Sequence, residues 1–592
     1  MNDLFLDIPV MDFDKTSHYL QDGCKKYRFE LDKKRCGIFQ MVFQDVSNIE
    51  QLANYIETAE FRYGPIEAII QTRLKMIVKI EGNTLICHSQ TIIAARYILV
   101  AINEKVLRNA TLSLANFVPK MYAYSDKGIF LSSDIMLNKI YDASKETIHM
   151  CTMQHHESYI ARNLSHTERA KTMSNWKRSS NDFVLMDGPR RDREVWIGDL
   201  LPEMRTSWYA FGDKEVLKNS MLVFVDQQQV DGFIPASSVS FQDFKEYNCW
   251  FVIVLYEYVL LTGDLDFAKE LRECYKSVLK NILKILDQNS LLNLGLMQTW
   301  AWTLARTGNI TSSQCVLYHC LICASKLEQL FGYEDYAFQY NTIANQVKES
   351  INRMAWDTNM GAYKNIANAN CNSYALDANA LAVMFNVSNS DQARKTLDFL
   401  DKNLSTKFGT KNLYPEEIAT KNNWCHNKHI WPFAVGFEVD ARFSAGDYLG
   451  AVDLIKRCWG TMINQGSYTF WEFMDGSTGG FVTDIMQNIE VEGDFWNSYC
   501  HGWSAGVGYS IVSNVAGIKP LTTGFKKFEI NLNVGGLEEI KAKVPTSFGD
   551  ISMQKSGKRV KVNVPDGVSG VIKVGNYKKE LMSGNYDIYV DF

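Results

Sequence analysis

The period of the hydrophobic pattern changes twice along this chain of 592 residues, and these changes limit the fold more than any other feature. Up to about residue 125, segments such as KYRFEL, IFQMVFQDV and AARYILVAI alternate apolar and polar residues, which is typical of strands. From about residue 130, apolar residues recur at i, i+3, i+4 and i+7, the pattern of amphipathic helices. Beyond about residue 520 the strand-like alternation returns. The chain is therefore predicted to be multidomain and mainly α, with a β-rich domain at residues 1–125, a helical domain at 126–518 and a β domain at 519–592.

Three Gly-Asp pairs divide the helical region into hairpins. They occur in FGDKEV, TGDLDF and AGDYLG, each time between two helical patterns. Glycine can end a helix in the left-handed conformation, and the aspartate that follows can cap the next helix. The spacing between the pairs is irregular, which argues against a solenoid repeat. We therefore expect successive helical hairpins arranged as an all-α toroid.

Net charge and cysteine content indicate which binding partners and which cellular location to expect for the protein. The net charge is −5 and no long Lys/Arg run occurs, so we expect neither nucleic acid nor an anionic membrane as the main partner. The segment MNDLFLDIPV has no signal-peptide pattern, and no stretch offers about 18 uncharged apolar residues. The 13 cysteines are scattered, as reduced thiols are. These features predict a cytoplasmic protein.

One cluster resembles a set of metal ligands: Cys425, His426 and His429 in WCHNKHIW. No second ligand pair follows at zinc-finger spacing, so we predict histidines of the core or of a substrate site, and no metal. The chain also lacks a P-loop and a GxGxxG segment after a strand. We therefore expect neither NTPase nor dinucleotide chemistry, and no cofactor.

The stretch MDGPRRDREVWIGDLLPE concentrates acids around a tryptophan. Asp187 before Gly-Pro predicts a helix start, with the aspartate as N-cap and the proline in the first turn. If a helix follows, one face carries Asp192, Trp196, Asp199 and Glu203. Acids on one helix face repel each other, so a purely structural helix gains nothing from this arrangement. A stripe in which acids alternate with an aromatic ring suits a ligand that is polar and partly apolar, such as a sugar. An ordinary solvated helix start stays open for this segment alone.

Aromatic residues surround a second acid about 280 residues downstream. Trp471 and Glu472 follow the strand-like SYTF, and Trp496, His501 and Trp503 come soon after. A glutamate between aromatic residues is partly desolvated, which raises its pKa toward values useful for proton transfer. An α toroid would bring both acidic regions to one cleft. Paired carboxylates on opposite sides of a bound sugar are the equipment of glycoside hydrolysis.

Four motifs occur in a fixed order: DGPRRDREVWIGD, GFIPASS, TFWE and SYCHGWSAG. Together they resemble glycoside hydrolase family 78, the α-L-rhamnosidases, and the resemblance covers roughly residues 125 to 592. It implies an (α/α)6 barrel catalytic domain flanked by N-terminal and C-terminal β-sandwich-like domains. It also implies an inverting mechanism.

The resemblance gives roles to individual residues. It makes Asp192 the general acid, although the family commonly has the longer glutamate at this position. Glu194 is the rival donor, but on one helix its side chain would point roughly 200° away from that of Asp192. Glu472 matches the general base. The substrate-binding positions are Asp187, Arg191, Trp196, Asp199, Trp300, Trp496 and His501.

The predicted reaction is the release of terminal α-L-rhamnose from oligosaccharides or glycosides by a single displacement. Asp192 would protonate the glycosidic oxygen while Glu472 deprotonates the attacking water. The expected partner is a rhamnoside substrate, and a homodimer is compatible with the sequence. Two alternatives stay open. One is another (α/α)6-barrel glycosidase with a different sugar specificity, which the departures from the family pattern at Asp192 and Thr299 leave open. The other is a catalytically inactive carbohydrate-binding homologue.

Overall fold

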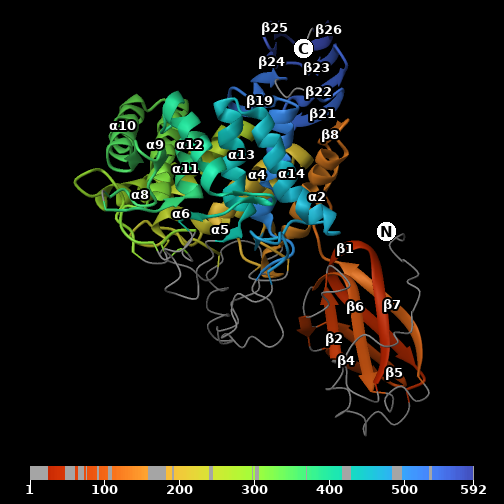
Figure 1. Ribbon diagram of the computed structural model, residues 1–592. Coiled ribbons are helices and arrows are strands. Elements are labelled where there is room, and N and C mark those ends of the chain that lie inside the picture. The colour runs from red at the N-terminus through yellow and green to blue at the C-terminus, as the bar shows by residue number, and fades with distance from the viewer. Residues whose placement is uncertain are drawn as a thin grey trace.

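The computed structural model has three parts (Figure 1). A sheet near the N-terminus, red to orange in the figure, forms one lobe, a helical body lies in the middle, and the C-terminal sheets in blue lie above that body. The described residues are 24–46, 60–64, 72–74, 76–89, 93–103, 110–157, 182–189, 193–238, 244–295, 298–300, 304, 306–368, 370–415, 428–482, 497–532 and 536–590.

Seven strands form the N-terminal sheet in the order β3-β2-β6-β1-β5-β4, with β7 also paired to β1. Their bounds are β1 Cys24–Gln44, β2 Glu60–Gly64, β3 Thr72–Leu74, β4 Met76–Glu81, β5 Thr84–Ser89, β6 Ile93–Asn103 and β7 Thr111–Pro119. The predicted segments KYRFEL and IFQMVFQDV both contribute to the long strand β1. Its first part pairs with β6 and its second part with β5 and β7. Phe29, Phe39 and Phe43 are fully buried in the core of this sheet.

The helical body consists of paired helices. In the described residues they are α2 Ile135–Cys151, α4 Ile197–Phe211, α5 Lys214–Val225, α6 Lys245–Thr262, α7 Leu265–Glu270, α8 Arg272–Lys284, α9 Thr311–Phe331, α10 Glu334–Met354, α11 Leu376–Met384, α12 Ser390–Asn403, α13 Pro432–Ala445, α14 Tyr448–Asn464 and α15 Val507–Ser510. α4 packs on α6, α6 on α9, α9 on α11, and α11 on α13. The 3-10 helix η5, Gly502–Gly506, contacts both α13 and α4, so these contacts close a ring. α8, α10 and α14 each pack against one helix of the ring, and α12 packs against both α11 and α13.

The three Gly-Asp pairs end and begin helices as predicted. Gly212, Gly263 and Gly446 follow the last residues of α4, α6 and α13, with φ of 60°, 76° and 84°. The aspartate after each glycine is the N-cap of the next helix, and its side chain accepts backbone N–H groups of the first turn. This local chemistry turns the chain back on itself and makes the helical hairpins.

Two sheets follow the helical body. One has four strands in the order β19-β20-β24-β25 and the other has five in the order β26-β23-β22-β21-β8. Their bounds are β8 Ile129–Ser132, β19 Ile518–Pro520, β20 Lys527–Asn531, β21 Glu539–Thr546, β22 Gly549–Ser556, β23 Arg559–Val564, β24 Ser569–Val574, β25 Tyr577–Leu581 and β26 Gly584–Tyr589. β8 precedes the first helix of the body, yet it is the edge strand of the C-terminal five-stranded sheet. Buried side chains of these sheets and of the helices form one continuous apolar cluster.

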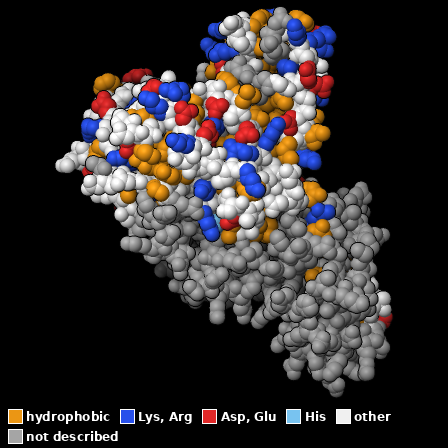
Figure 2. Space-filling view, viewed as in Figure 1, with side chains coloured by type: hydrophobic (Ala, Val, Ile, Leu, Met, Phe, Trp, Pro, Cys, Tyr) orange, Lys and Arg blue, Asp and Glu red, His pale blue; other side chains and the backbone are white. Residues whose placement is uncertain are grey.

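Charged side chains of both signs are interspersed over the described surface of the helical body and the C-terminal sheets (Figure 2). Among the described residues, no helix is both long enough and apolar enough to cross a membrane.

Candidate active site

The predicted helix start at Asp187 is wrong. α4 begins at Ile197, and its N-cap, Trp196, makes no side-chain cap hydrogen bond. Asp187 instead closes a loop with Glu194. Its Oδ1 accepts the N–H of Glu194 at 3.0 Å, and its own N–H donates to the carbonyl of Glu194 at 2.9 Å. Such side-chain bonds offer the backbone an alternative to the helix. The prediction that one helix face carries Asp192 with Trp196, and turns Glu194 away, therefore fails.

The segment GFIPASS holds the end of this loop. The N–H of Ile197 donates to the carbonyl of Ala236 at 3.0 Å. The N–H of Ser238 donates to the carbonyl of Val195 at 2.9 Å, and its Oγ accepts the N–H of Val195 at 3.1 Å. These bonds run on both sides of the half-buried Trp196. The second motif of the predicted set is thus part of the same site as the first.

Two acids lie one turn apart at the start of α4. Asp199 is 2% exposed and Glu203 is fully buried. Within the described part of the chain, neither carboxyl oxygen of Glu203 has a hydrogen-bond partner. Burial raises the pKa of Glu203 well above its usual value, and the negative charge of Asp199 adds to the effect. Glu203 therefore favours its neutral, protonated form.

Glu472 is held by the backbone of a facing segment. Its N–H donates to the carbonyl of Ser498 at 2.8 Å, and its Oε2 accepts the N–H of Ser498 at 3.1 Å. The indole Nε1–H of Trp503 donates to the carbonyl of Glu472 at 3.3 Å. The residue is 3% exposed. A buried carboxylate with fixed backbone partners is a pre-positioned group, as a general base requires.

The two acidic regions meet in the fold. The N–H of Gly502 donates to the carbonyl of Asp187 at 2.7 Å. The preceding residue, His501, has its Nε2 3.5 Å from Oδ2 of Asp199. The N–H of His501 donates to the carbonyl of Phe470, two residues before Glu472. Asp187, Asp199, Glu472 and His501 are therefore brought together from segments nearly 300 residues apart in the sequence, as predicted for a toroid.

The segment GWSAG in η5 has the spacing of a serine nucleophile motif, but it is not built as one. Ser504 is fully buried, and its Oγ donates to the carbonyl of Trp471 at 2.6 Å. The motif requires an exposed hydroxyl on a strand-to-helix turn. Ser504 instead ties η5 to the segment that carries Glu472.

An aromatic wall, defined as Trp300, Trp431, Phe433 and Trp503, adjoins these residues. Phe433 and Trp503 stack with ring centroids 4.9 Å apart. Trp300 contacts Phe433 at 5.1 Å and Trp503 at 6.2 Å, and Trp431 lies 5.6 Å from Trp503. The ring of His501 is 4.4 Å from that of Trp503, which joins the wall to the acids. Trp300 was predicted at the site from sequence, whereas Trp431 and Phe433 were missed.

A buried ion pair lies against Trp300. Asp377, in the first turn of α11, accepts hydrogen bonds from Arg306 Nη1 at 2.9 Å, Arg306 Nη2 at 2.8 Å and Trp300 Nε1 at 2.9 Å. Arg306 also donates to Thr299 Oγ1 at 3.5 Å and to Asn365 Oδ1 at 3.2 Å. None of the sequence motifs includes this pair. One signal was available, because Asp377 is a charged residue inside the apolar run YALDANALAV.

Glu246, at the start of α6, is a further buried acid close to this ion pair. Its carboxyl accepts the indole N–H of Trp250 at 3.2 Å and the hydroxyl of Ser313 at 2.5 Å. Burial raises the pKa of Glu246 to about 7, and the positive charge of Arg306 opposes part of that rise. The acid thus titrates near neutral pH.

Several predicted site residues lie outside the described residues. They are Asp192, Arg191 and Trp496, together with Cys425 and His426 of the cluster considered for metal binding. His429 of that cluster is buried, with its ring 5.5 Å from that of Phe473. In the described ranges, no group of three or more His, Cys, Asp or Glu side chains is placed to hold a metal ion.

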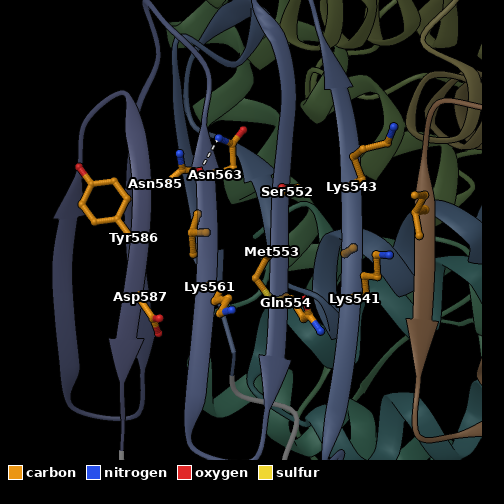
Figure 3. Close-up of a pocket in the computed structure, with 13 residues that line it drawn as sticks. Lys541, Lys543, Ser552, Met553, Gln554, Lys561, Asn563, Asn585, Tyr586 and Asp587 are labelled. Carbon is orange, nitrogen blue, oxygen red and sulfur yellow. Dashed lines mark hydrogen bonds between the residues drawn. The ribbon is translucent and has the colours of Figure 1, made fainter.

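A hollow of about 500 Å³ lies on the C-terminal five-stranded sheet (Figure 3). Polar side chains of four strands line it, among them Lys541, Gln554, Lys561, Asn563 and Asp587. Its lining residues include none of the predicted site residues. The hollow is therefore separate from the candidate active site.

The class of protein follows from comparison with known families. Residues 160–409 match the family model described as the bacterial alpha-L-rhamnosidase 6 hairpin glycosidase domain. This segment includes the Asp187 loop, α4, the wall residue Trp300 and the Asp377 ion pair. Residues 160–409 are thus similar to a glycosidase domain. The family description names the α-L-rhamnosidases, the same class of protein that the sequence motifs resemble.

Solved structures of rhamnosidases share the fold. The family 78 rhamnosidase of Bacillus sp. GL1 has a TM-score of 0.67 at 17% identity, over 96% of this chain and 55% of that one. The α-L-rhamnosidase from Dictyoglumus thermophilum has 0.69 at 16%, over 96% and 62%. The Klebsiella oxytoca rhamnosidase with rhamnose bound has 0.61 at 19%, over 83% and 87%. The chain thus spans little more than half the length of the first two. A search of curated proteins finds no match.

Proposed function

We propose that the protein is an inverting exo-glycoside hydrolase that releases terminal α-L-rhamnose from oligosaccharides or glycosides. One observation carries the proposal. The segment Ser498–Gly502 bridges the two parts of the chain to which the predicted acid–base pair belongs: Gly502 N–H donates to the carbonyl of Asp187 at 2.7 Å, and the carbonyl of Ser498 accepts the N–H of Glu472 at 2.8 Å. The aromatic wall beside them suits the apolar ring face and methyl group of a 6-deoxy sugar.

In the proposed mechanism Asp192 protonates the glycosidic oxygen while Glu472 removes a proton from water that attacks the anomeric carbon. An inverting enzyme needs about 6.5–9.5 Å between the two carboxyl groups, to leave room for that water. Asp187, Asp199, Arg191 and His501 would hold the sugar hydroxyls and orient the acids. Trp196 and Trp496 would add further stacking surface.

We propose that the closed ring of helices is the (α/α)6 barrel of residues 126–518. The packing of α8, α10, α12 and α14 on helices of the ring supports this arrangement. We also propose β-sandwich domains at residues 1–125 and 519–592. In the first, β1 pairs with β6 in one part and with β5 and β7 in the other, as a strand shared between two layers would. In the second, the two C-terminal sheets share one apolar cluster.

Hydrolysis of 4-nitrophenyl α-L-rhamnoside tests the function. We expect activity in the wild type and a loss of about 1000-fold or more in kcat for Asp192→Asn and for Glu472→Gln, because each removes a proton-transfer group. Glu194→Gln separates the rival donor from Asp192. Glu349→Gln, an exposed acid on α10, is the matched control and should keep full activity. Full activity in Asp192→Asn or Glu472→Gln would refute the assigned roles, and a wild type inactive on every rhamnoside would refute the substrate.

The stereochemical course is a separate test. Proton NMR during hydrolysis should detect β-L-rhamnose before mutarotation, since an inverting enzyme changes the anomeric configuration once. First appearance of the α anomer would contradict the inverting mechanism.

We further propose a cytoplasmic location. The eleven described cysteines are all free thiols, and all but Cys371 are buried. They include Cys320 and Cys323, which have the Cys-x-x-Cys spacing on α9, and the pair Cys151 and Cys500, whose sulfur atoms share a hydrogen bond at 4.0 Å and form no disulfide. Free thiols at such spacing fit a reducing compartment. Cell fractionation tests the location, and light scattering tests whether the protein is a homodimer.

A further inference from the structure

The Asp377–Arg306 ion pair is almost completely buried and is held by two hydrogen bonds. Both side chains are about 1% exposed, and the guanidinium binds the carboxylate with two hydrogen bonds. Burial alone would raise the pKa of Asp377, but the charge of Arg306, with the hydrogen bonds that Arg306 and Trp300 donate, holds that pKa below its usual value. A buried ion pair is weak evidence for stability, because apolar residues of similar size stabilise a core as well. Its presence calls for another role.

Trp300 is the group that this pair fixes. An indole has a single donor, Nε1–H, and in Trp300 that donor is bound to Asp377 Oδ2 at 2.9 Å. The same ring lies 5.1 Å from Phe433 and 6.2 Å from Trp503. Trp503 in turn contacts His501, which lies beside Asp199. The orientation of the Trp300 ring in the aromatic wall therefore depends on the carboxylate of Asp377.

We infer that Asp377 is a positioning residue of the sugar site: with Arg306 behind it, the carboxylate locks the indole of Trp300 in the plane that stacks on the substrate. The inference rests on the proposed function. It adds to that function a residue that touches no sugar and acts through Trp300. Because stacking on the wall contributes equally to binding the substrate and the transition state, losing it should raise KM and leave kcat nearly unchanged.

The chain offers a matched control at Glu328 on α9. Glu328 is fully buried and accepts the Nε and Nη2 of Arg272 at 3.1 and 2.8 Å, and the hydroxyl of Tyr275 at 2.6 Å. Like Asp377, Glu328 therefore accepts two hydrogen bonds from an arginine and one from an aromatic side chain. Its partners are not in the aromatic wall. Glu328→Gln reports the effect of breaking a buried ion pair as such.

The experiment compares Asp377→Asn, Trp300→Phe, the double variant and Glu328→Gln on 4-nitrophenyl α-L-rhamnoside. Losing a charge-assisted hydrogen bond should raise KM about tenfold in Asp377→Asn, with kcat within about twofold of wild type. In the Trp300→Phe background the same change should add little, because residues that act through one contact are not additive. Additive effects in the double variant, or an equal rise of KM in Glu328→Gln, would overturn the inference. If Asp377→Asn does not fold, Asp377→Glu, which keeps the charge but displaces the carboxylate, takes its place with the same expected result.

Near-ultraviolet circular dichroism gives a readout that needs no activity. The difference between wild type and Trp300→Phe defines the signal of the fixed indole. Asp377→Asn should lose that signal, and Glu328→Gln should keep it. A retained signal in Asp377→Asn would overturn the inference even if the enzyme is active. A wild type without activity on rhamnosides would refute the proposed function alone, since the spectra still decide what Asp377 does.

Discussion

Glu246 makes the free energy of unfolding of the helical body depend on pH. Its pKa is about 7 in the fold, against an ordinary value of 4.5. Between these two pH values the folded state keeps a proton that the unfolded state has lost. The resulting contribution to the free energy of unfolding is complete below pH 4.5 and disappears as the pH rises through 7, by about 3 kcal/mol in total.

We expect Glu246→Gln to flatten this part of the pH profile, because glutamine stays neutral at every pH. Urea unfolding at several pH values between 4.5 and 7 measures the effect. The stability of wild type relative to the variant should fall steadily across that range. Parallel profiles would contradict the pKa given to Glu246.

Gly502 is the residue at which the two halves of the site touch. A Cβ added there would lie 1.7 Å from Oε1 of Glu203, which is fully buried and cannot swing into solvent. Gly502→Ala should therefore reduce the free energy of unfolding by about 2 kcal/mol through overpacking. It should also lower kcat/KM, because the backbone of Gly502 carries the bond to Asp187. Thermal unfolding and rhamnoside hydrolysis measure the two effects.

The double variant Gly502→Ala/Glu203→Ala is the control for this prediction. Removing the carboxyl group clears the space that the new methyl group needs, so the double variant should be more stable than Gly502→Ala alone. If it is not, the clash with Glu203 is not the cause.

The sequence could predict a site residue where that residue belongs to a motif whose neighbouring residues together are distinctive. Glu472 and His501 were predicted as site residues because each stands in a distinctive motif, and their roles stay predictions. Asp377 was not, because its partners Trp300 and Arg306 lie 77 and 71 residues away, and only the fold brings them into contact. The failure at Asp187 has a different origin. Its side chain has two backbone targets within reach, and it binds the N–H of Glu194 rather than capping a helix.

At the scale of elements, helix ends can be tested with two glycines of α13. Gly446 follows the helix at φ 84°, and Gly436 lies inside it, and neither has any atom within 4 Å of the position of an added Cβ. Gly446→Ala should cost about 1 kcal/mol through left-handed backbone strain. Gly436→Ala should gain up to about 1 kcal/mol through helix propensity. Urea unfolding compares the two, and a change of the same sign in both would contradict this account.

The same glycines explain which elements the sequence could predict. A Gly-Asp pair acts within four residues, so all three hairpin junctions were placed correctly. The N-cap of α4 was placed nine residues too early, at Asp187 instead of Trp196. That boundary depends on the distant GFIPASS segment, whose backbone bonds on both sides of Trp196 keep the preceding residues out of the helix.

At the scale of the whole molecule, the N-terminal sheet and the C-terminal sheets are connected to the helical body in different ways. The N-terminal sheet has a core of its own, and among the described residues Cys36, Ala94 and the partly buried Ile38 connect it to the main apolar cluster. The C-terminal sheets share that cluster with the helices. They also bond to them directly, as Ser547 Oγ does to the carbonyl of Thr262 at 2.6 Å.

Two truncations should therefore behave differently. A chain that begins at residue 120 should keep a cooperative unfolding transition and its helical circular dichroism, because the main core stays covered. A chain that ends at residue 518 should lose both, because the apolar side of the helical body and strand β8 lose their cover. Far-ultraviolet spectra and urea unfolding of the two chains test this, and a stable 1–518 chain would refute it.

The period change predicted strands at both ends of the chain, but it did not predict the membership of β8. A strand of four residues has too little pattern to reveal its sheet, and β8 was assigned to the helical domain. Its partner β21 is supplied by the far end of the sequence.

This pairing has a consequence for synthesis. Ser133, just after β8, bonds to Glu538, which is made 405 residues later. At roughly 5–20 residues per second, the ribosome needs roughly 20–80 seconds to bring the partner of β8 out of the exit tunnel. Throughout that time the edge of β8 lacks the strand that pairs with it in the finished fold. We expect the nascent chain to need protection against pairing with other chains at this edge until β21 emerges.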